Sequence, residues 1–215
     1  DLVVPTGDFL ARGREAGVYA DIDMARLSNI GNQDNQVQGL ADSQMADTKA
    51  GIVYMWGTTG IGYNIGKVED ALGKDAPLDS WSLVFDPANM EKLSDCGVHF
   101  LDAPTEMIPA ALKYIGEDPN SHDPEVIAKA EAVYSAVRPY IRKFHSSEYI
   151  NALANGEICV ALMWSGDAFI AADRASEANN GHNINYVIPK EGTNLWFDMM
   201  AIPKDAKNVK NAHKF

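Results

Sequence analysis

The sequence lacks long hydrophobic runs and any excess of positive charge, and these absences exclude two broad classes of function. No apolar run approaches the roughly 18 residues that a membrane-spanning helix requires. The formal net charge of -12 argues against nucleic acid as a partner, because binding phosphates requires basic patches. The acidic balance is compatible with a cationic ligand, whose approach a negative field accelerates.

Cysteine and histidine are too sparse to form the usual metal sites. Cys96 and Cys159 are the only cysteines, and no histidine lies at ligand spacing from either one. The pair is therefore compatible with a disulfide or with two buried thiols, and it argues against a zinc site. We expect neither a metal nor a cofactor.

Familiar motifs for nucleophilic catalysis and phosphate binding are also missing. The sequence has no Gly-x-Ser-x-Gly segment, and the run Gly57–Gly62 lacks both the lysine of a phosphate loop and the spacing of a dinucleotide-binding loop. A hydrolase that uses paired carboxylates, as glycosidases do, stays an alternative, and it would need one acid with a raised pKa. We expect a binding protein and not an enzyme.

Strand-like and helix-like segments alternate along most of the chain, which is typical of an α/β protein. Hydrophobic residues make up 46% of the sequence, enough for a substantial core. Residues 28–50 are polar and weakly periodic, and they predict a loop with one helical turn. Helices are expected over residues 7–16, 104–116, 123–137, 147–155 and 166–180, and strands over 51–64, 98–101, 158–164, 183–188 and 195–202.

The chain has two candidate crossings between lobes. One lies near residues 51–60, where glycines permit a strand to bend, and the other near residues 189–196, where Pro189–Gly192 interrupts the strands. The predicted lobes are residues 1–52 as part of a first lobe, residues 53–190 as a second lobe, and residues 191–215 as a return to the first.

Two strand-like segments place a tryptophan shortly before an aspartate. Trp164 precedes Asp167, and Trp196 precedes Asp198. An aromatic face attracts an organic ammonium, and a carboxylate supplies charge and accepts its hydrogen bonds. Core tryptophans and loop aspartates would give the same pattern, but two such pairs favour a site for an organic cation.

A third acid stands just after a strand-like segment. Glu106 follows residues 100–104 and opens the next helix. The helix dipole alone favours a glutamate in a first turn, so a structural role and a ligand-binding role both stay open. Asp102 is expected to cap the same helix.

Motifs of one known family occur in five segments, which are Asp1–Pro5, Tyr54–Asn64, Phe144–Ile150, Leu153–Ala161 and Ile188–Gly192. These segments resemble the periplasmic putrescine/spermidine-binding proteins of polyamine ABC transporters, which belong to the type II periplasmic binding proteins. The similarity extends over essentially all 215 residues. The motifs are specific to this family and not to binding proteins in general.

The resemblance implies an α/β fold with two lobes, mixed sheets flanked by helices, and the ligand in the cleft between the lobes. It implies an extracytoplasmic, periplasmic solute-binding protein that holds a linear polyamine, putrescine or spermidine. The loaded protein would deliver the polyamine to the permease of an ABC transporter. We expect it to act as a monomer without nucleic acid.

The resemblance also assigns residues to the site. The family's ligand-binding positions match Thr6, Glu106, Trp164, Asp167, Trp196 and Asp198. Thr6 keeps a hydroxyl where serine is the usual residue in the family. Cys96 and Cys159 fall where family members form a disulfide, which implies an oxidising compartment.

Family members are longer at both ends, and their amino-terminal strand with a Trp-Ser-Asp-Tyr-like motif has no counterpart here. We therefore expect a fragment that is poorly stable and binds ligand weakly or not at all on its own. A binding protein for another cation, such as a basic amino acid, is the alternative within the same class. Its site would require an arginine for the ligand carboxylate, and no arginine stands beside the two tryptophan–aspartate pairs.

Overall fold

A computed structural model of the protein describes residues 1–44 and 50–215. These residues form two compact units. Unit 1 consists of Asp1–Gly57 and Leu195–Phe215, and unit 2 consists of Thr58–Asn194. The long strand β2 (Gly51–Asn64) contributes residues to both units. The lobe boundaries that the sequence predicts, after residues 52 and 190, stay a prediction.

Unit 2 is built on a mixed sheet in which β2 has a neighbour on each side. On one side β2 pairs antiparallel with β6 (Ile184–Val187), and on the other side it pairs antiparallel with β5 (Val160–Trp164). The sheet continues through β3 (Val98–Phe100) and β4 (Lys143–Phe144), which run parallel to their neighbours. Residues Val160–Met163 of β5 are completely buried, which explains their continuous apolar run.

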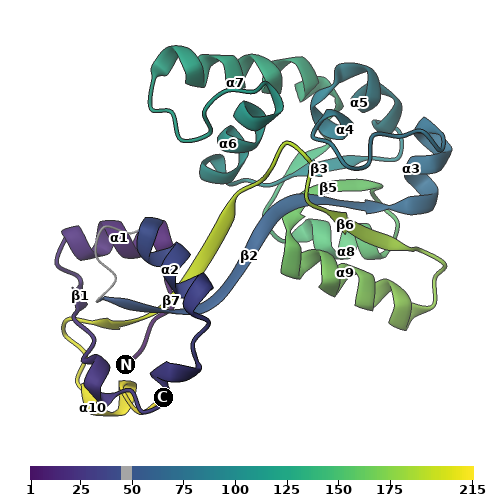
Figure 1. The fold of residues 1–215 in the computed structure, drawn as a ribbon. Helices are drawn as coiled ribbons and strands as arrows, with labels where there is room; N and C mark the ends of the chain where they lie inside the picture. Colours follow the sequence, from purple (N-terminus) through teal and green to yellow (C-terminus); the bar gives the residue numbers. More distant parts are fainter. Residues whose placement is uncertain (45–49) are drawn as a thin grey trace. The chain divides into compact units, whose positions relative to one another are not determined.

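Helices cover both faces of the unit 2 sheet (Figure 1). One face carries α3 (Ile65–Leu72), α4 (Ser82–Phe85), α5 (Pro87–Leu93), α6 (Pro104–Tyr114) and α7 (Pro124–Val137). The short 3₁₀ helix η3 (Arg138–Tyr140) packs against α5 and α7. The opposite face carries α8 (Glu148–Ala154) and α9 (Ser165–Ala178). This mixed α/β arrangement, a sheet flanked by helices, confirms the predicted fold class.

The glycines of the predicted bending strand allow close packing within the sheet of unit 2. A Cβ atom on Gly60 would collide with the side chain of Tyr186, and one on Gly62 would collide with the sulfur of Met163. A Cβ atom on Gly60 would also lie 2.5 Å from the backbone carbonyl oxygen of Val187, so a larger residue at this position would separate β2 from β6.

A disulfide joins Cys96 to Cys159, with 5.5 Å between their Cα atoms. The two cysteines precede β3 and β5, and these strands are parallel neighbours in which Val98 lies opposite Val160. The register of the strands thus brings the two cysteines together. The disulfide that the family resemblance implies is confirmed.

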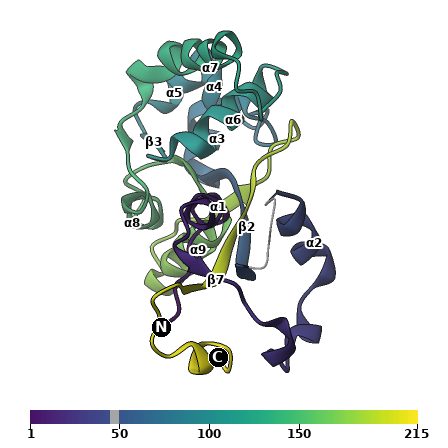
Figure 2. The ribbon, with the colours of Figure 1, turned by 90° about the vertical axis from the view of Figure 1, so that its left-hand side faces the viewer.

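In unit 1, β1 (Tyr19–Ala20) pairs antiparallel with β7 (Leu195–Pro203), and β7 in turn lies beside β2. The remaining elements are α1 (Gly7–Glu15), η1 (Met24–Arg26), η2 (Ile30–Asn32), α2 (Asn35–Gln44) and α10 (Val209–Ala212). Both chain ends lie in this unit, near α10 (Figure 2). No helix within residues 1–44 and 50–215 is long and apolar enough to cross a bilayer.

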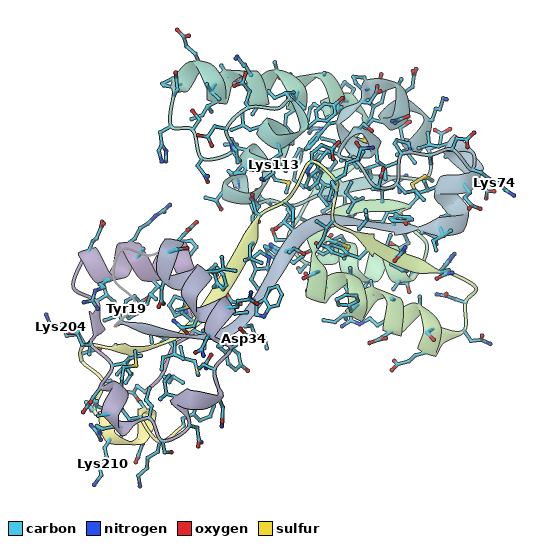
Figure 3. All side chains as sticks on the ribbon, viewed as in Figure 1. Tyr19, Asp34, Lys74, Lys113, Lys204 and Lys210 are labelled. Atoms are coloured by element: carbon cyan, nitrogen blue, oxygen red, sulfur yellow. A yellow bond between two sulfur atoms is a disulfide. The ribbon has the colours of Figure 1, made fainter. Side chains whose placement is uncertain are left out.

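The helix α2 is longer than the single turn that the sequence predicts for residues 28–50. Asp34, labelled in Figure 3, accepts hydrogen bonds from the backbone N–H groups of Gln36 and Val37 and so caps the helix. Ala41 is fully buried on the unit 1 core. Polar residues around these few anchors obscure the helical periodicity, which explains the error. The last part of the predicted loop, residues 45–49, lies outside the described residues.

Two helices begin without a side-chain cap from the adjacent serine or aspartate. Ser147 occupies the cap position of α8, but the backbone N–H groups of Ser147 and Glu148 both donate to His145 Nδ1, at 3.1 Å. Ala103 stands at the cap position of α6, where Asp102 was expected to act. In the first case a nearby imidazole nitrogen replaces the serine oxygen as acceptor.

The disulfide yields a prediction about stability. Replacing both Cys96 and Cys159 by serine should lower the free energy of unfolding by about 4 kcal/mol, because the bridge closes a long loop in the unfolded chain. Urea unfolding of the natural full-length protein, with and without a reductant, measures this difference. The reductant should have no effect on the double variant, and equal stability of the wild type in both conditions would refute the prediction.

His99 yields a prediction about pH. It is buried on β3, and its pKa is lowered first by burial and then by the charges of Arg142, Lys143 and His145, against the opposing charge of Glu148. As pH falls, the imidazole of His99 is protonated in the unfolded chain at a higher pH than in the folded protein. The free energy of unfolding should therefore decrease as pH drops below about 6.5 towards the lower folded pKa.

Replacing His99 by phenylalanine should reduce this loss of stability at acid pH, because the variant lacks the titrating group. The substitution removes no hydrogen bond of Nδ1, which has no partner among the described residues. Unfolding free energies measured at about pH 7 and about pH 5 give the comparison. Equal acid losses in the variant and the wild type would show that His99 does not cause the effect.

Candidate functional site

Each of the three predicted site acids accepts a hydrogen bond from a hydroxyl that is distant in the sequence. A neutral hydroxyl can fix the position of a carboxylate without neutralising its charge. The three pairs, donor first, are Thr59–Glu106, Tyr149–Asp167 at 2.6 Å and Thr6–Asp198 at 3.0 Å. The first two pairs belong to unit 2 and the third to unit 1.

In unit 2 the register of the sheet assembles the group. Thr59 of β2 lies opposite Trp164, the last residue of β5. The helix α9 begins directly after Trp164, and Asp167 lies in its first turn. Thr59 is fully buried and donates its hydroxyl to Glu106, in the first turn of α6. One strand pair therefore connects Trp164 with Glu106.

The end of the segment after β6 supports Glu106 and Thr59 together. Asn194 Nδ2 donates to the carbonyl oxygen of Glu106 at 3.1 Å, and the Asn194 carbonyl accepts from the Thr59 N–H at 3.2 Å. The Thr193 hydroxyl donates to the carbonyl oxygen of Thr59. These contacts fix the backbone on both sides of the Thr59–Glu106 hydrogen bond.

The same segment is anchored to the core through Trp81, which is fully buried. The indole Nε1 of Trp81 donates to the Gly192 carbonyl at 2.9 Å, and its backbone N–H donates to Glu191 Oε2 at 3.2 Å. Gly192 adopts φ 91°, a left-handed conformation that favours glycine. The family-like segment Ile188–Gly192 thus has a structural role in placing residues 193 and 194.

Two tyrosines border the acids of unit 2, the buried Tyr149 and the partly buried Tyr186. The pKa of Tyr149 is raised first by burial, then by its hydrogen bond to Asp167 and the charge of that residue, and further by the charge of Glu106. The pKa of Tyr186 is raised to about 12 by burial and by the charge of Glu106, although its hydrogen bond with Thr58 acts in the opposite direction. Both hydroxyls therefore keep their protons near neutral pH and act as donors.

The carboxylates of Asp167 and Asp198 have no cationic partner among the described residues. The ion pairs found among the described residues involve other acids, for example Asp21 with Arg14 and Asp79 with Lys190. Asp167 and Asp198 are both partly buried. A partly buried carboxylate with a fixed position and no protein cation is suited to a cationic ligand.

In unit 1 the alternation of β7 separates core residues from candidate ligand-binding residues. Phe197 and Met199 are buried in the core of the unit, whereas Trp196 and Asp198 lie on the opposite face of the strand. Thr6 forms an antiparallel bridge with Asp198. Its side chain does not cap α1, and it donates to Asp198 Oδ1 at 3.0 Å.

The structure thus groups Glu106, Trp164 and Asp167 in unit 2, and it groups Thr6, Trp196 and Asp198 in unit 1. Their role in ligand binding stays a prediction. Sequence reasoning missed Thr59 and Tyr149 as partners of the acids. They lie 47 and 18 residues from Glu106 and Asp167, respectively, so no local spacing signals the contact.

Comparison with known proteins supplies the family. The chain matches the family model of the bacterial extracellular solute-binding proteins over residues 1–215. It is 49% identical over 215 residues to the putrescine-binding periplasmic protein SpuD of Pseudomonas aeruginosa (strain UCBPP-PA14), and 49% identical over 216 residues to the putrescine-binding periplasmic protein PotF of Escherichia coli (strain K12). All of this chain is covered, together with 59% of SpuD and 58% of PotF.

The fold has solved relatives as well. The TpPotD lipoprotein of Treponema pallidum superimposes with a TM-score of 0.79 at 26% sequence identity, covering 100% of this chain and 63% of that protein. The chain therefore spans about three fifths of the length of the curated relatives that it matches. Because the family match extends over the whole chain, this protein belongs to the bacterial extracellular solute-binding proteins.

Proposed function

We propose that the protein binds a linear polyamine, putrescine or spermidine, in the periplasm and delivers it as a monomer to the permease of an ABC transporter. The observation that carries the proposal is the set of three carboxylates, each fixed by a neutral hydroxyl. The names of SpuD and PotF, both putrescine-binding periplasmic proteins, support the ligand class.

The chemistry of a polyamine matches these groups. A carboxylate accepts charge-assisted hydrogen bonds from a primary ammonium, and a tryptophan face attracts the cation and packs against the methylene chain. Trp164 stands three residues before Asp167, and Trp196 stands two residues before Asp198 on the same strand face. Each unit by itself therefore contains a carboxylate and a tryptophan suited to an organic ammonium.

The energies required are modest. Each cation–π contact contributes about 0.5–2 kcal/mol, and a hydrogen bond to a charged group contributes about 1.5–3 kcal/mol. Micromolar affinity corresponds to about 8 kcal/mol. A few such contacts are therefore sufficient for micromolar affinity.

Calorimetric titration of the natural full-length protein with putrescine and spermidine tests the proposal. Asp167→Asn and Asp198→Asn should each weaken binding by about tenfold or more, because each removes a charge that an ammonium would face. Asp173→Asn and Asp205→Asn are matched controls, since both aspartates are exposed and neither belongs to the candidate site. Absence of binding to either amine, or binding of basic amino acids in their place, would refute the proposal.

The hydroxyl of Thr59 gives a second test. Thr59→Val keeps the shape of this buried side chain but removes the donor to Glu106, so putrescine affinity should fall several-fold, by about 1 kcal/mol. Thr59→Ser keeps the hydroxyl and should keep most of the affinity. If valine and serine at this position had the same effect, packing and not the hydrogen bond would account for the role of Thr59.

A further inference from the structure

Tyr149 combines complete burial with a contact to a candidate ligand-binding acid. Its side chain is 0% exposed, and its hydroxyl donates to Asp167 Oδ2 at 2.6 Å. Tyr149 therefore holds Asp167 without being exposed itself.

The position of Tyr149 is fixed by the helix that carries it. Tyr149 is the second residue of α8, and α8 packs against α9, which carries Asp167. His145 Nδ1 accepts the N–H groups of Ser147 and Glu148 at the start of α8. The capped first turn of α8 thus presents the hydroxyl to Asp167.

This contact makes the two oxygens of the Asp167 carboxylate unequal. Oδ2 is engaged by Tyr149, whereas Oδ1 has no hydrogen-bond partner among the described residues. A primary ammonium is a point charge that a single oxygen can receive. A guanidinium is a planar fork that binds a carboxylate best through both oxygens at once.

We propose that Tyr149 is a positioning and specificity-determining residue, which holds Oδ2 of Asp167 so that Oδ1 receives a terminal primary ammonium in preference to a guanidinium. The assignment rests on the proposed polyamine function, and it specifies the ligand end group that Asp167 selects. Tyr149 acts through Asp167 and does not itself contact the ligand.

Two ligands of equal chain length test the assignment by calorimetry on the natural full-length protein. Putrescine ends in two primary ammonium groups, and 1,4-diguanidinobutane ends in two guanidinium groups, so either orientation presents the same end group. The wild type should prefer putrescine. Tyr149→Phe frees Oδ2, so the preference should fall by about tenfold, with weaker putrescine binding and unchanged or stronger binding of the guanidinium ligand.

Tyr63→Phe is the matched control. Tyr63 is also buried, and its hydroxyl accepts a hydrogen bond from Asn185 at 3.0 Å, away from the carboxylates. This variant should leave the preference unchanged. If Tyr149→Phe lowers the affinity for both ligands equally, or for neither, the assignment is overturned while the proposal of polyamine binding stands. A wild type that binds no putrescine would instead refute the proposed function, and the assignment with it.

A second variant covers the case in which Tyr149→Phe does not fold. Asp167→Glu moves the carboxylate one methylene away from the Tyr149 hydroxyl, in a partly buried first helix turn that tolerates acids. The preference for putrescine over 1,4-diguanidinobutane should fall here too. An unchanged preference in this variant would also overturn the assignment. Circular dichroism of each variant confirms that the fold is kept.

Discussion

The hydrogen bond from a neutral hydroxyl to a carboxylate is the interaction on which the candidate site depends. Carboxylates inside a protein are usually matched by a lysine or arginine, which cancels their charge. In this chain Asp167 and Asp198 are held by Tyr149 and Thr6, without an ion pair to a described residue. The position of each acid is thus determined while its charge stays available. This combination is what recognition of an organic ammonium requires.

The fold supplies the hydroxyls through strand register and helix packing. The pairing of β2 with β5 places Thr59 opposite Trp164, and Thr59 in turn holds Glu106. The disulfide before β3 and β5 ties these two neighbouring strands together. The helices α8 and α9 pack against each other and bring Tyr149 to Asp167. The core of unit 2 therefore determines the geometry of its charged groups.

Parts of this arrangement were predictable from the sequence because they depend on local patterns. The helix expected over residues 123–137 is α7, which begins at Pro124, and the strand expected over residues 195–202 is β7, which ends at Pro203. The disulfide pairing, and Thr6 as a site residue, came from the family resemblance. Glu106 and the two tryptophan–aspartate pairs were already candidates because each follows or ends a strand-like segment.

Other parts depend on contacts between distant segments and had no local signal. The cap of α8 comes from His145 and not from the adjacent serines. The helix α2 carries few apolar anchors, so its length was underestimated. Above all, Tyr149 and Thr59 act as donors only because the tertiary structure places them beside acids elsewhere in the chain. No spacing rule could have identified them.

A crystal structure of the natural full-length protein grown with putrescine tests the central claim most directly. The account predicts an ammonium nitrogen about 3 Å from Asp167 Oδ1, the methylene chain against Trp164, and the Tyr149 hydroxyl still bonded to Oδ2. A carboxylate of Asp167 paired with a lysine or arginine of the protein itself, with the diamine bound elsewhere, would contradict it.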